Sequence, residues 1–245
     1  MNAPVRIAAW SGPRNISTAL MRSFENRPDT FVTDEPFYAH YLANTSVTHP
    51  GQQEILASQP TDWHEVVNSC TASAKPGCSV HYQKHMTQHI LPHITLEWLA
   101  EVKNIFLIRA PDAVVASYSK SRSNPDASDL GFIQQARLFN EVCDQQGSAP
   151  LVIDSVHLLQ NPSTALQRVC EHCGIAFDEN MLQWPAGKRD SDGVWAPYWY
   201  HSVEASTGFG KPREQQTIDL DKHQQQIAAD CWPYYESMAQ HRISF

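Results

Sequence analysis

The sequence has little glycine, little positive charge and no long apolar run. Its 245 residues include 10 glycines and 18 lysines and arginines, against 26 aspartates and glutamates, so the formal net charge is −8. A nucleic-acid-binding surface needs a clustered basic face that releases counterions from phosphates, and no run of lysine and arginine is present. We therefore expect no nucleic-acid partner.

Signals for membranes and secretion are also missing. No stretch approaches 18 consecutive apolar residues, and the N-terminal residues lack the charged-then-apolar layout of a signal peptide. The six cysteines are dispersed, which favours reduced thiols over a disulfide scaffold. These absences predict a cytoplasmic protein without a membrane partner. The chain is long enough for one substantial core, and we expect a single domain over residues 1–245.

Short apolar runs alternate with amphipathic helical patterns along the chain. Strands are expected at 5–10, 31–33, 78–82, 104–108 and 151–153, and helices at 62–74, 93–101, 112–122, 130–146, 162–173 and 220–239. Gly174 stands where a C-cap glycine would end the helix at 162–173. Strands that alternate with helices typically form a parallel sheet with helices on both faces. The sequence therefore predicts a three-layer α/β/α fold with a central parallel sheet.

The first expected strand is followed by residue types that bind anions. After the turn at Ser11, Gly12 and Pro13, a cation and two hydroxyls stand at the start of a helix, whose backbone N–H groups attract anions. These residues are Arg14, Asn15, Ile16, Ser17 and Thr18. A Walker A loop reads G-x-x-x-x-G-K-[ST], and its second glycine and its lysine are missing here. A phosphotransferase that uses ATP is therefore the less favoured alternative.

A second candidate phosphate site follows the strand at 104–108. Arg109 ends this strand, and Ser117 follows eight residues later on a helix. Together with the first loop, this pair resembles the P-loop sulfotransferases, in which a strand-terminal arginine and a helical serine at this separation grip the 3'-phosphate of the donor. The resemblance implies a P-loop nucleoside triphosphate hydrolase-like fold and 3'-phosphoadenosine 5'-phosphosulfate as co-substrate. It also implies that residues 14–18 hold the 5'-phosphosulfate.

The resemblance spans roughly residues 5–180, because the segment at 151–177 is similar to the family's later strand–helix unit. The segments around 10–24 and 34–42 look like an uncharacterised sulfotransferase-like group that is often labelled by similarity to aminotransferase-associated proteins. The family's C-terminal Arg-Lys-Gly signature is missing as such. Its candidate replacements are Gly208, Phe209, Gly210 and Lys211, or Lys188 and Arg189.

Sulfuryl transfer is an in-line displacement that needs a base for the acceptor hydroxyl or amine and positive charge at the leaving phosphate. Glu35 is one candidate base, since heparan-type sulfotransferases place a glutamate similarly. His85 is the other, because Ile-Leu-Pro follows it much as Leu-Leu-Pro follows the catalytic histidine of cytosolic sulfotransferases. Histidine suits neutral pH, whereas a glutamate needs burial to raise its pKa, and both remain open. Lys84 would contact the bridging oxygen, and Arg14 would stabilise the departing phosphate.

Several of these residues also have purely structural interpretations. Asp34 or Glu35 would serve equally as an N-terminal helix cap. His85, His89 and His93 have the spacing of metal ligands, but Pro92 interrupts the helix that would align them, so we predict no metal site.

The region at 184–213 mixes aromatic residues with glycine, proline and charges, and we predict a long functional loop there. Trp195, Tyr198, Trp199 and Tyr200 would wall an acceptor pocket, stack on adenine or pack in the core. Cys170 and Cys173 lie inside a helical pattern without a partner pair, which favours buried structural cysteines.

The residues thus favour an enzyme that transfers a sulfuryl group from 3'-phosphoadenosine 5'-phosphosulfate to a hydroxyl or amine of a small-molecule acceptor. The alternatives are a P-loop phosphotransferase using ATP and a noncatalytic nucleotide-binding protein that kept the phosphate cradle. The loops around 36–76 and 184–213 would shape the acceptor pocket.

Overall fold

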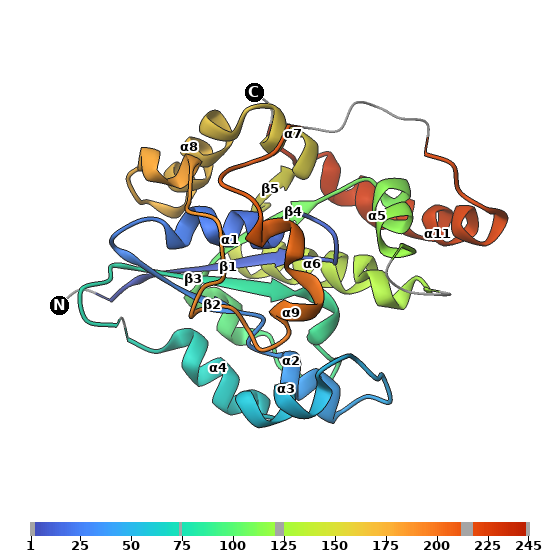
Figure 1. The fold of residues 1–245 in the computed structure, drawn as a ribbon, viewed down its shortest axis with the longest axis horizontal. Coiled ribbons are helices and arrows are strands. Elements are labelled where there is room, and N and C mark those ends of the chain that lie inside the picture. The colour runs from blue at the N-terminus through green and yellow to red at the C-terminus, as the bar shows by residue number, and fades with distance from the viewer. Residues whose placement is uncertain (1–2, 74, 121–124, 212–217, 244–245) are drawn as a thin grey trace.

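Five parallel strands form the centre of the protein in a computed structural model that describes residues 3–73, 75–120, 125–211 and 218–243 (Figure 1). They are β1 (Val5–Ser11), β2 (Thr30–Asp34), β3 (Val80–Met86), β4 (Lys103–Ile108) and β5 (Leu151–Asp154), in the order β2-β3-β1-β4-β5. The chain runs from β1 past β3 to β2 at one edge of the sheet, and then from β3 past β1 to β4 on the other side, so the direction of the connections reverses where β3 and β1 lie side by side. Ligands of open α/β sheets bind at such a switch point, beyond the carboxyl ends of the strands.

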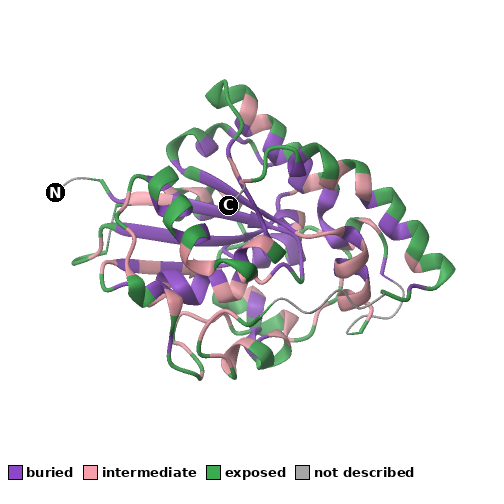
Figure 2. Ribbon diagram, turned by 90° about the horizontal axis from the view of Figure 1, so that it is seen from above, coloured by how far each residue is buried: buried purple, intermediate pink, exposed green. Residues whose placement is uncertain are grey.

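Helices cover both faces of the sheet. Figure 1 shows α1 (Ser17–Glu25) and α8 (Pro162–Cys173) on one side and α4 (Trp63–Thr71) on the other. The remaining helices are α2 (Tyr38–Ala43), α3 (Gln52–Ser58), η1 (Thr87–His89), η2 (Glu97–Glu101), α5 (Pro111–Tyr118), η3 (Ser128–Leu130), α6 (Phe132–Gln146), α7 (Ser155–Gln160), η4 (Glu179–Leu182), α9 (Ala196–Trp199), α10 (His201–Glu204) and α11 (Lys222–Ala239). In Figure 2 the buried strands lie between helices whose outer faces are exposed. The predicted three-layer α/β fold with a central parallel sheet is confirmed.

Two hydrophobic cores form because strand side chains alternate between the faces. On β1, Ile7 and Ala9 pack with α1 and α8, whereas Ala8 and Trp10 pack with α4, α6 and η2. Strands buried on both faces are continuous apolar runs, which explains the pattern of β1 and β4 in the sequence. The same alternation directs Lys84 of β3 to one face and its neighbours to the other.

The sequence predictions differ from the structure in several elements. The strand expected at 78–82 is β3 over Val80–Met86, so the prediction wrongly ended it before its polar second half, which is buried among hydrogen-bonding partners. The helix expected at 93–101 is wrong before Glu97, where the 3-10 helix η2 begins.

At the C-terminal half the agreement is closer. The helix expected at 112–122 ends at Tyr118, and positions 121–122 lie outside the described residues. The helix at 162–173 is confirmed, with Gly174 in the left-handed conformation at φ 72°. The region at 184–213 is not a plain loop, because α9 and α10 lie within it, and positions 212–213 fall outside the described residues.

Within the described part of the chain, none of the helices has the length and hydropathy required to span a bilayer.

Candidate functional site

The loop between β1 and α1 has an unusual backbone at the start of a helix. Arg14 and Ile16 adopt the left-handed conformation, with φ of 63° and 57°. The side-chain amide of Asn15 donates hydrogen bonds to the carbonyl oxygens of Gly12 and Pro13, at 3.2 and 3.4 Å. These features wind the loop tightly where the first N–H groups of α1 have no partner within the helix. Such a turn forms an anion-binding concavity.

The two predicted phosphate-binding elements come together. A guanidinium N–H of Arg109 donates to the backbone oxygen of Arg14 at 2.6 Å, and Nε of Arg14 donates to Oγ of Ser117 at 3.1 Å. This contact follows from the sheet order, since β1 and β4 are neighbours and both residues lie beyond the carboxyl ends of these strands. Two guanidinium groups and a hydroxyl therefore stand beside the loop that opens α1.

A buried charged cluster lies at the ends of β2 and β3. Lys84 donates to Oδ1 of Asp34 at 2.9 Å, to the hydroxyl of Tyr200 at 2.9 Å, and to Oε1 of Glu35. The Tyr200 hydroxyl in turn donates to Oδ2 of Asp34 at 2.6 Å and accepts from the indole of Trp195 at 3.2 Å. The cluster thus joins two strands to the segment that contains α9.

Two effects set the pKa values in this cluster. They are the burial of its charged groups and the excess of carboxylates over cations. Burial raises the pKa of the Glu35 carboxyl, and the Lys84 ammonium acts in the opposite direction. Burial by itself lowers the pKa of Lys84, but the Asp34 and Glu35 carboxylates outweigh it and hold that pKa well above its ordinary value. One cation facing two carboxylates gives the cluster a net negative charge. Glu35 can therefore take up a proton readily.

Neither carboxylate of the cluster caps a helix. The next helix, α2, begins at Tyr38, and its N-cap residue Phe37 makes no side-chain capping bond. Glu35 instead has φ of 42°, and its N–H donates to the backbone oxygen of Lys84 at 2.9 Å. In the sequence Asp34 indicated only a helix cap, because its partner Lys84 lies 50 residues further along the chain.

His85 does not face the same way as Lys84. Its ring stacks on Trp10 with centroids 4.3 Å apart, and Nε2 contacts Oε1 of Gln83 at 3.1 Å. Burial lowers the pKa of His85 to about 3. The prediction of His85 as a base is therefore corrected, because the alternation of β3 turns its side chain into the core.

His89 lines the cleft and lies near Glu35, whereas His85 does neither. It is 2% exposed, its ring stacks against Tyr38 and Tyr41, and Nδ1 lies 4.0 Å from Oε2 of Glu35. Burial holds the pKa of His89 well below its ordinary value, so the imidazole is neutral. The sequence pattern presented His89 only as a possible metal ligand.

The three histidines do not converge on a metal site. His85 lies in the core, His89 beside Glu35, and Nε2 of His93 contacts Nε2 of His40 at 3.0 Å. Across the described ranges, no group of three or more histidine, cysteine, aspartate or glutamate side chains is arranged to hold a metal ion. Cys170 and Cys173 are buried free thiols within α8.

A cleft of about 500 Å³ connects the loop and the charged cluster. Its lining includes residues 13–19, Glu35, Tyr38, His49, Lys84, Met86, Gln88, His89, Arg109, Ser117, Tyr118, Leu159, Trp199, Tyr200, Ser202, Val203, Ser206 and 208–210. One end carries the guanidinium groups of Arg14 and Arg109, and the other carries Glu35 among aromatic rings. The cleft therefore has room and charge for an anionic nucleotide next to a less charged second substrate.

The C-terminal candidates divide between the cleft and its surroundings. Gly208 and Phe209 line the cleft, whereas Lys211 is exposed and does not. Lys188 and Arg189 also lie outside the lining, and Arg189 instead pairs with Glu25 of α1 at 3.6 Å.

Two of the four aromatic residues that the sequence suggested for a pocket wall line the cleft. Trp199 and Tyr200 line the cleft, Trp195 is buried beneath Tyr200, and Tyr198 is 45% exposed.

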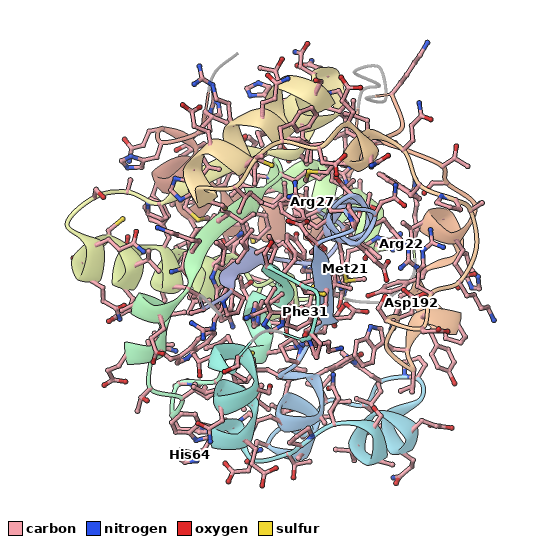
Figure 3. The ribbon with its side chains drawn as sticks, turned by 90° about the vertical axis from the view of Figure 1, so that its left-hand side faces the viewer. Met21, Arg22, Arg27, Phe31, His64 and Asp192 are labelled. Carbon is pink, nitrogen blue, oxygen red and sulfur yellow. The ribbon has the colours of Figure 1, made fainter. Side chains whose placement is uncertain are left out.

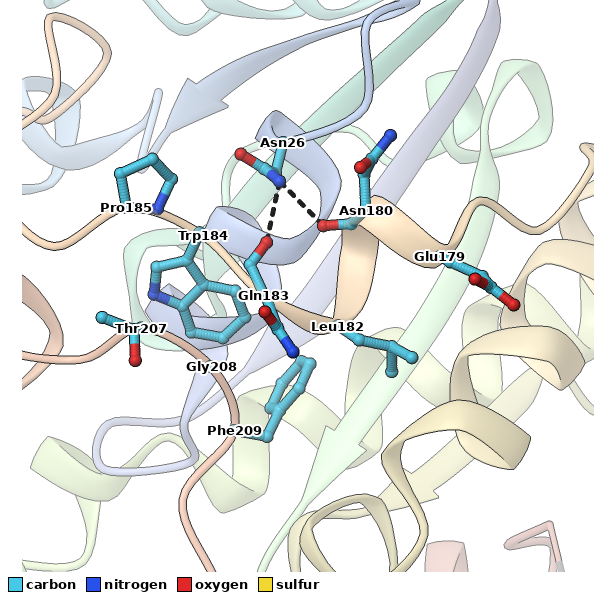
Figure 4. A pocket seen from close by; sticks show the side chains of 10 residues that line it. All are labelled: Asn26, Glu179, Asn180, Leu182, Gln183, Trp184, Pro185, Thr207, Gly208 and Phe209. Atoms are coloured by element: carbon cyan, nitrogen blue, oxygen red, sulfur yellow. Dashed lines mark hydrogen bonds between the residues drawn. The ribbon is translucent and has the colours of Figure 1, made fainter.

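A second cleft shares Gly208 and Phe209 with the first (Figure 4). It has a volume of about 860 Å³ and is lined by Asn26, Glu179, Asn180, Leu182, Gln183, Trp184, Pro185, Thr207, Gly208 and Phe209. Asn26 donates to the backbone oxygens of Asn180 and Gln183 at 2.8 and 2.7 Å, so its amide holds the wall together. These lining residues include one carboxylate and no cation, which makes this cleft unsuited to phosphate.

The segment before α9 is fixed to α1 by a buried ion pair. Arg22 is 1% exposed and donates to Asp192 at 2.7 Å and to Glu25 at 3.2 Å. Figure 3 shows Arg22 and Asp192 directed toward one another. This contact, together with the Tyr200 bonds, holds residues 192–200 over the ends of β2 and β3.

Comparisons with known proteins identify the family of this chain. A family model described as a sulfotransferase domain matches residues 5–242. The "Branched-chain-amino-acid aminotransferase-like protein 1" of Arabidopsis thaliana is 36% identical over 214 residues, covering 87% of this chain and 38% of that protein. Protein 2 of the same name and organism is 34% identical over 237 residues, covering 96% and 41%. The chain thus spans about two fifths of the length of these relatives.

Solved structures share the fold at low sequence identity. The sulfotransferase domain of the Synechococcus PCC 7002 olefin synthase has a TM-score of 0.59 at 17% identity and covers 94% of each chain. The sulfotransferase domain from the curacin biosynthetic pathway has a TM-score of 0.56 at 16% identity, covering 94% of this chain and 98% of its own. These similarities support the P-loop nucleoside triphosphate hydrolase-like fold that was predicted.

Proposed function

This chain belongs to the sulfotransferase domain family, and from that premise we propose that it transfers a sulfuryl group from 3'-phosphoadenosine 5'-phosphosulfate to a small-molecule acceptor. The observation that carries the proposal is one cleft that joins the Arg14, Arg109 and Ser117 group to Glu35 and Lys84. The first group suits the phosphates of the donor. The second suits the deprotonation of an acceptor.

In this proposal the donor binds at the cationic end of the cleft. The loop at residues 14–18 surrounds the 5'-phosphosulfate with backbone N–H groups and the hydroxyls of Ser17 and Thr18. Arg109 and Ser117 bind the 3'-phosphate through charge-assisted hydrogen bonds. Phe209, which lines the cleft, offers an aromatic face for the adenine.

At the other end Glu35 is the general base. As the acceptor oxygen or nitrogen attacks sulfur, its proton passes to Glu35, the bond between sulfur and the bridging oxygen breaks, and that electron pair stays on the 5'-phosphate. Arg14 neutralises the charge that develops there, and Lys84 places a fixed cation beside the reacting atoms. Because both charges are positioned before the reaction, no reorganisation is needed in the transition state.

An alternative use of ATP is less well supported by the cleft. The loop has no lysine, and an arginine stands at the end of β4 where a magnesium-binding aspartate would be expected of a nucleoside triphosphatase. The first experiment should therefore distinguish the two nucleotides directly.

That experiment is calorimetric titration with adenosine 3',5'-bisphosphate, the desulfated product, against ADP and Mg-ATP. We expect the bisphosphate to bind most tightly and Arg109→Ala to weaken it about 10-fold or more, the effect of losing a hydrogen bond to a charged group. Arg168→Ala is the matched control, since Arg168 lies exposed on α8 and pairs only with Glu171 among its described contacts. Tight Mg-ATP binding without bisphosphate binding would instead establish the phosphotransferase. Bisphosphate binding without turnover on a broad acceptor panel would establish the noncatalytic protein.

A further inference from the structure

We infer that Arg22 and Asp192 are positioning residues for sulfuryl transfer. Their buried ion pair holds Gly193 against Asp34, and this contact fixes the ammonium group of Lys84 in the cleft. Neither member of the pair lines the cleft, so their effect on the reaction passes through other residues. The inference deepens the proposed function and rests on it.

The ion pair is buried and has a well-defined geometry. The side chains of Arg22 and Asp192 are 1% and 5% exposed, and Nη2 of Arg22 lies 2.6 and 2.7 Å from the two carboxylate oxygens. Oδ2 of Asp192 also accepts the backbone N–H of Arg189 at 2.9 Å, and Nη1 of Arg22 donates to Glu25 at 3.2 Å. The cost of burying two charges is offset only where the geometry is good and further hydrogen bonds satisfy them. Asp192 is therefore held at one defined place on α1.

The residue after Asp192 reaches the end of β2. The backbone N–H of Gly193 donates to Oδ2 of Asp34 at 3.2 Å. A Cβ atom on Gly193 would lie between 2.1 and 2.3 Å from ring atoms of Trp195, so the chain passes here only without a side chain. The same indole donates to the Tyr200 hydroxyl at 3.2 Å. A shift of residues 192–193 would therefore disturb both contacts.

Asp34 is the group on which these contacts meet. Its Oδ2 atom accepts from Gly193 and, at 2.6 Å, from the hydroxyl of Tyr200. Its Oδ1 atom accepts from Lys84 at 2.9 Å. The Asp34 side chain is 1% exposed and is not part of the cleft lining, whereas Lys84 is. Asp34 therefore influences the cleft through Lys84.

The ammonium group of Lys84 takes its position from its partners. It has three N–H donors, and these meet Asp34, Tyr200 and Glu35. A lysine stem is flexible, so these acceptors decide where the charge lies. In a displacement reaction, a misplacement of about 1 Å can cost about 100-fold in rate. The place of Asp34 therefore matters to the reaction although Asp34 is outside the cleft.

The helix α1 gives the donor and this cation a common reference. It begins at Ser17, within the loop proposed to bind the 5'-phosphosulfate, and Arg22 lies on its second turn. The ion pair sets the position of residues 192–193 relative to this same helix. A shift of that segment along α1 would change the distance between Lys84 and the sulfur–oxygen bond that breaks.

The test uses variants that separate positioning from folding. Arg22→Met leaves Asp192 buried without its cation, which destabilises the protein. The double variant Arg22→Met/Asp192→Leu removes both charges, and such apolar replacements of buried ion pairs are often neutral for stability. Arg22→Lys keeps the charge but loses the planar fork of donors. Arg168→Met is the matched control, because Arg168 is an exposed arginine that pairs with Glu171 three residues later.

Transfer and donor binding are measured on each variant. Sulfur-labelled donor is supplied with a broad acceptor panel and with water alone, and calorimetry gives the affinity for adenosine 3',5'-bisphosphate. We expect Arg22→Met and the double variant to lower kcat about 10- to 100-fold, because the Lys84 charge is displaced. Bisphosphate affinity should stay within about 2-fold. Arg22→Lys should lie between these variants and the wild type, which Arg168→Met should match.

Amide exchange at Gly193 reports the contact without any turnover. Gly193 is the one glycine in the sequence that follows an aspartate, so isotopic labelling of glycine nitrogen and aspartate carbonyl carbon identifies its signal by nuclear magnetic resonance. We expect this amide to exchange about 10-fold faster or more in Arg22→Met and in the double variant, because local opening frees it from Asp34. Arg168→Met should leave the exchange unchanged.

Several results would overturn the inference. They are wild-type transfer by the double variant, Gly193 exchange that does not respond to loss of the pair, and bisphosphate affinity that falls in parallel with kcat. A wild type that binds bisphosphate but transfers to neither acceptor nor water would overturn it as well, because no reacting group would then be positioned. A wild type that does not bind bisphosphate removes the proposed function instead, and Gly193 exchange still shows whether the ion pair holds its contact with Asp34.

Discussion

Glu35 combines a strained backbone with a buried side chain. Among the described residues, the non-glycine positions with positive φ are Arg14, Ile16 and Glu35, and all three line the cleft. Left-handed backbone in such residues costs free energy and persists where the surrounding structure enforces it, commonly at functional sites. The strain therefore identifies the cleft independently of sequence similarity.

Replacing the carboxyl of Glu35 should separate chemistry from donor binding. We expect Glu35→Gln to lower kcat about 10²- to 10⁴-fold, the usual contribution of a general base, while bisphosphate affinity changes little. Labelled-donor assays and calorimetry measure the two effects. Because burial raises the pKa of Glu35, wild-type kcat/KM should fall as the pH drops through that raised value. Retained turnover in Glu35→Gln would remove Glu35 as the base.

Lys84 is expected to matter for stability as well as for catalysis. Lys84→Met leaves Asp34 and Glu35 buried without their cation, and breaking a buried ion pair on one side costs about 3–5 kcal/mol. Urea unfolding measures the loss. Lys188→Met is the control, since Lys188 is exposed. A loss of less than about 1 kcal/mol, the usual value for surface pairs, would show that the cluster contributes little.

At the scale of elements, the loop between β1 and α1 depends on contact with a distant segment. A Cβ atom on Gly12 would lie 2.4 Å from the backbone oxygen of Leu130, at the end of η3. That segment is held in turn by Thr87, whose hydroxyl donates to the backbone oxygen of Gly131 at 3.0 Å. The loop between β1 and α1 thus packs directly on the backbone of Leu130, which could move away only by breaking other contacts.

Gly12→Ala should consequently be destabilising. The overlap with Leu130 forces a backbone shift, and overpacking of this kind costs about 1–3 kcal/mol. Gly210→Ala is a matched control, because a Cβ atom there would meet no heavy atom within 4 Å. Urea unfolding of both variants tests the prediction. Equal stability of the two would mean that the loop does not depend on this close approach.

At the scale of the whole molecule, buried neutral histidines should make the protein sensitive to acid. Burial lowers the pKa of His81 to about 4 and that of His85 to about 3, and it also lowers the pKa of His40 and His89. Between the ordinary histidine pKa and these values, the unfolded chain binds more protons than the folded one. The free energy of unfolding therefore falls as the pH drops below about 6.5.

Urea unfolding at pH 6.5 and 5.5 measures this dependence. Each such histidine contributes up to about 1.4 kcal/mol per pH unit, so His81→Gln should reduce the slope by roughly that amount. His64→Gln is the control, since the His64 side chain is 66% exposed. A slope that is unchanged in His81→Gln would contradict a neutral buried imidazole at this position.

The sequence by itself determined the features that depend on residues close together along the chain. Apolar runs and helical periodicity specify a parallel sheet between helices, because each element must bury its own apolar face. The loop at residues 14–18 and the pair of Arg109 and Ser117 could also be predicted from the sequence, since each group begins directly after a strand. The sheet order then brings the two groups together at the ends of β1 and β4.

Only the tertiary structure decided which polar side chains of the third strand enter the cleft. The direction of Lys84 and His85 depends on where β3 begins and pairs, and the expected strand ended before both residues. The bonds of Tyr200 to Lys84 and Asp34 join positions 116 and 166 residues apart, beyond the reach of any local pattern. His89 approaches Glu35 only because η1 and the end of β2 fold beside each other. A reactive site assembled from separate segments depends on packing, which a linear pattern of residue types does not encode.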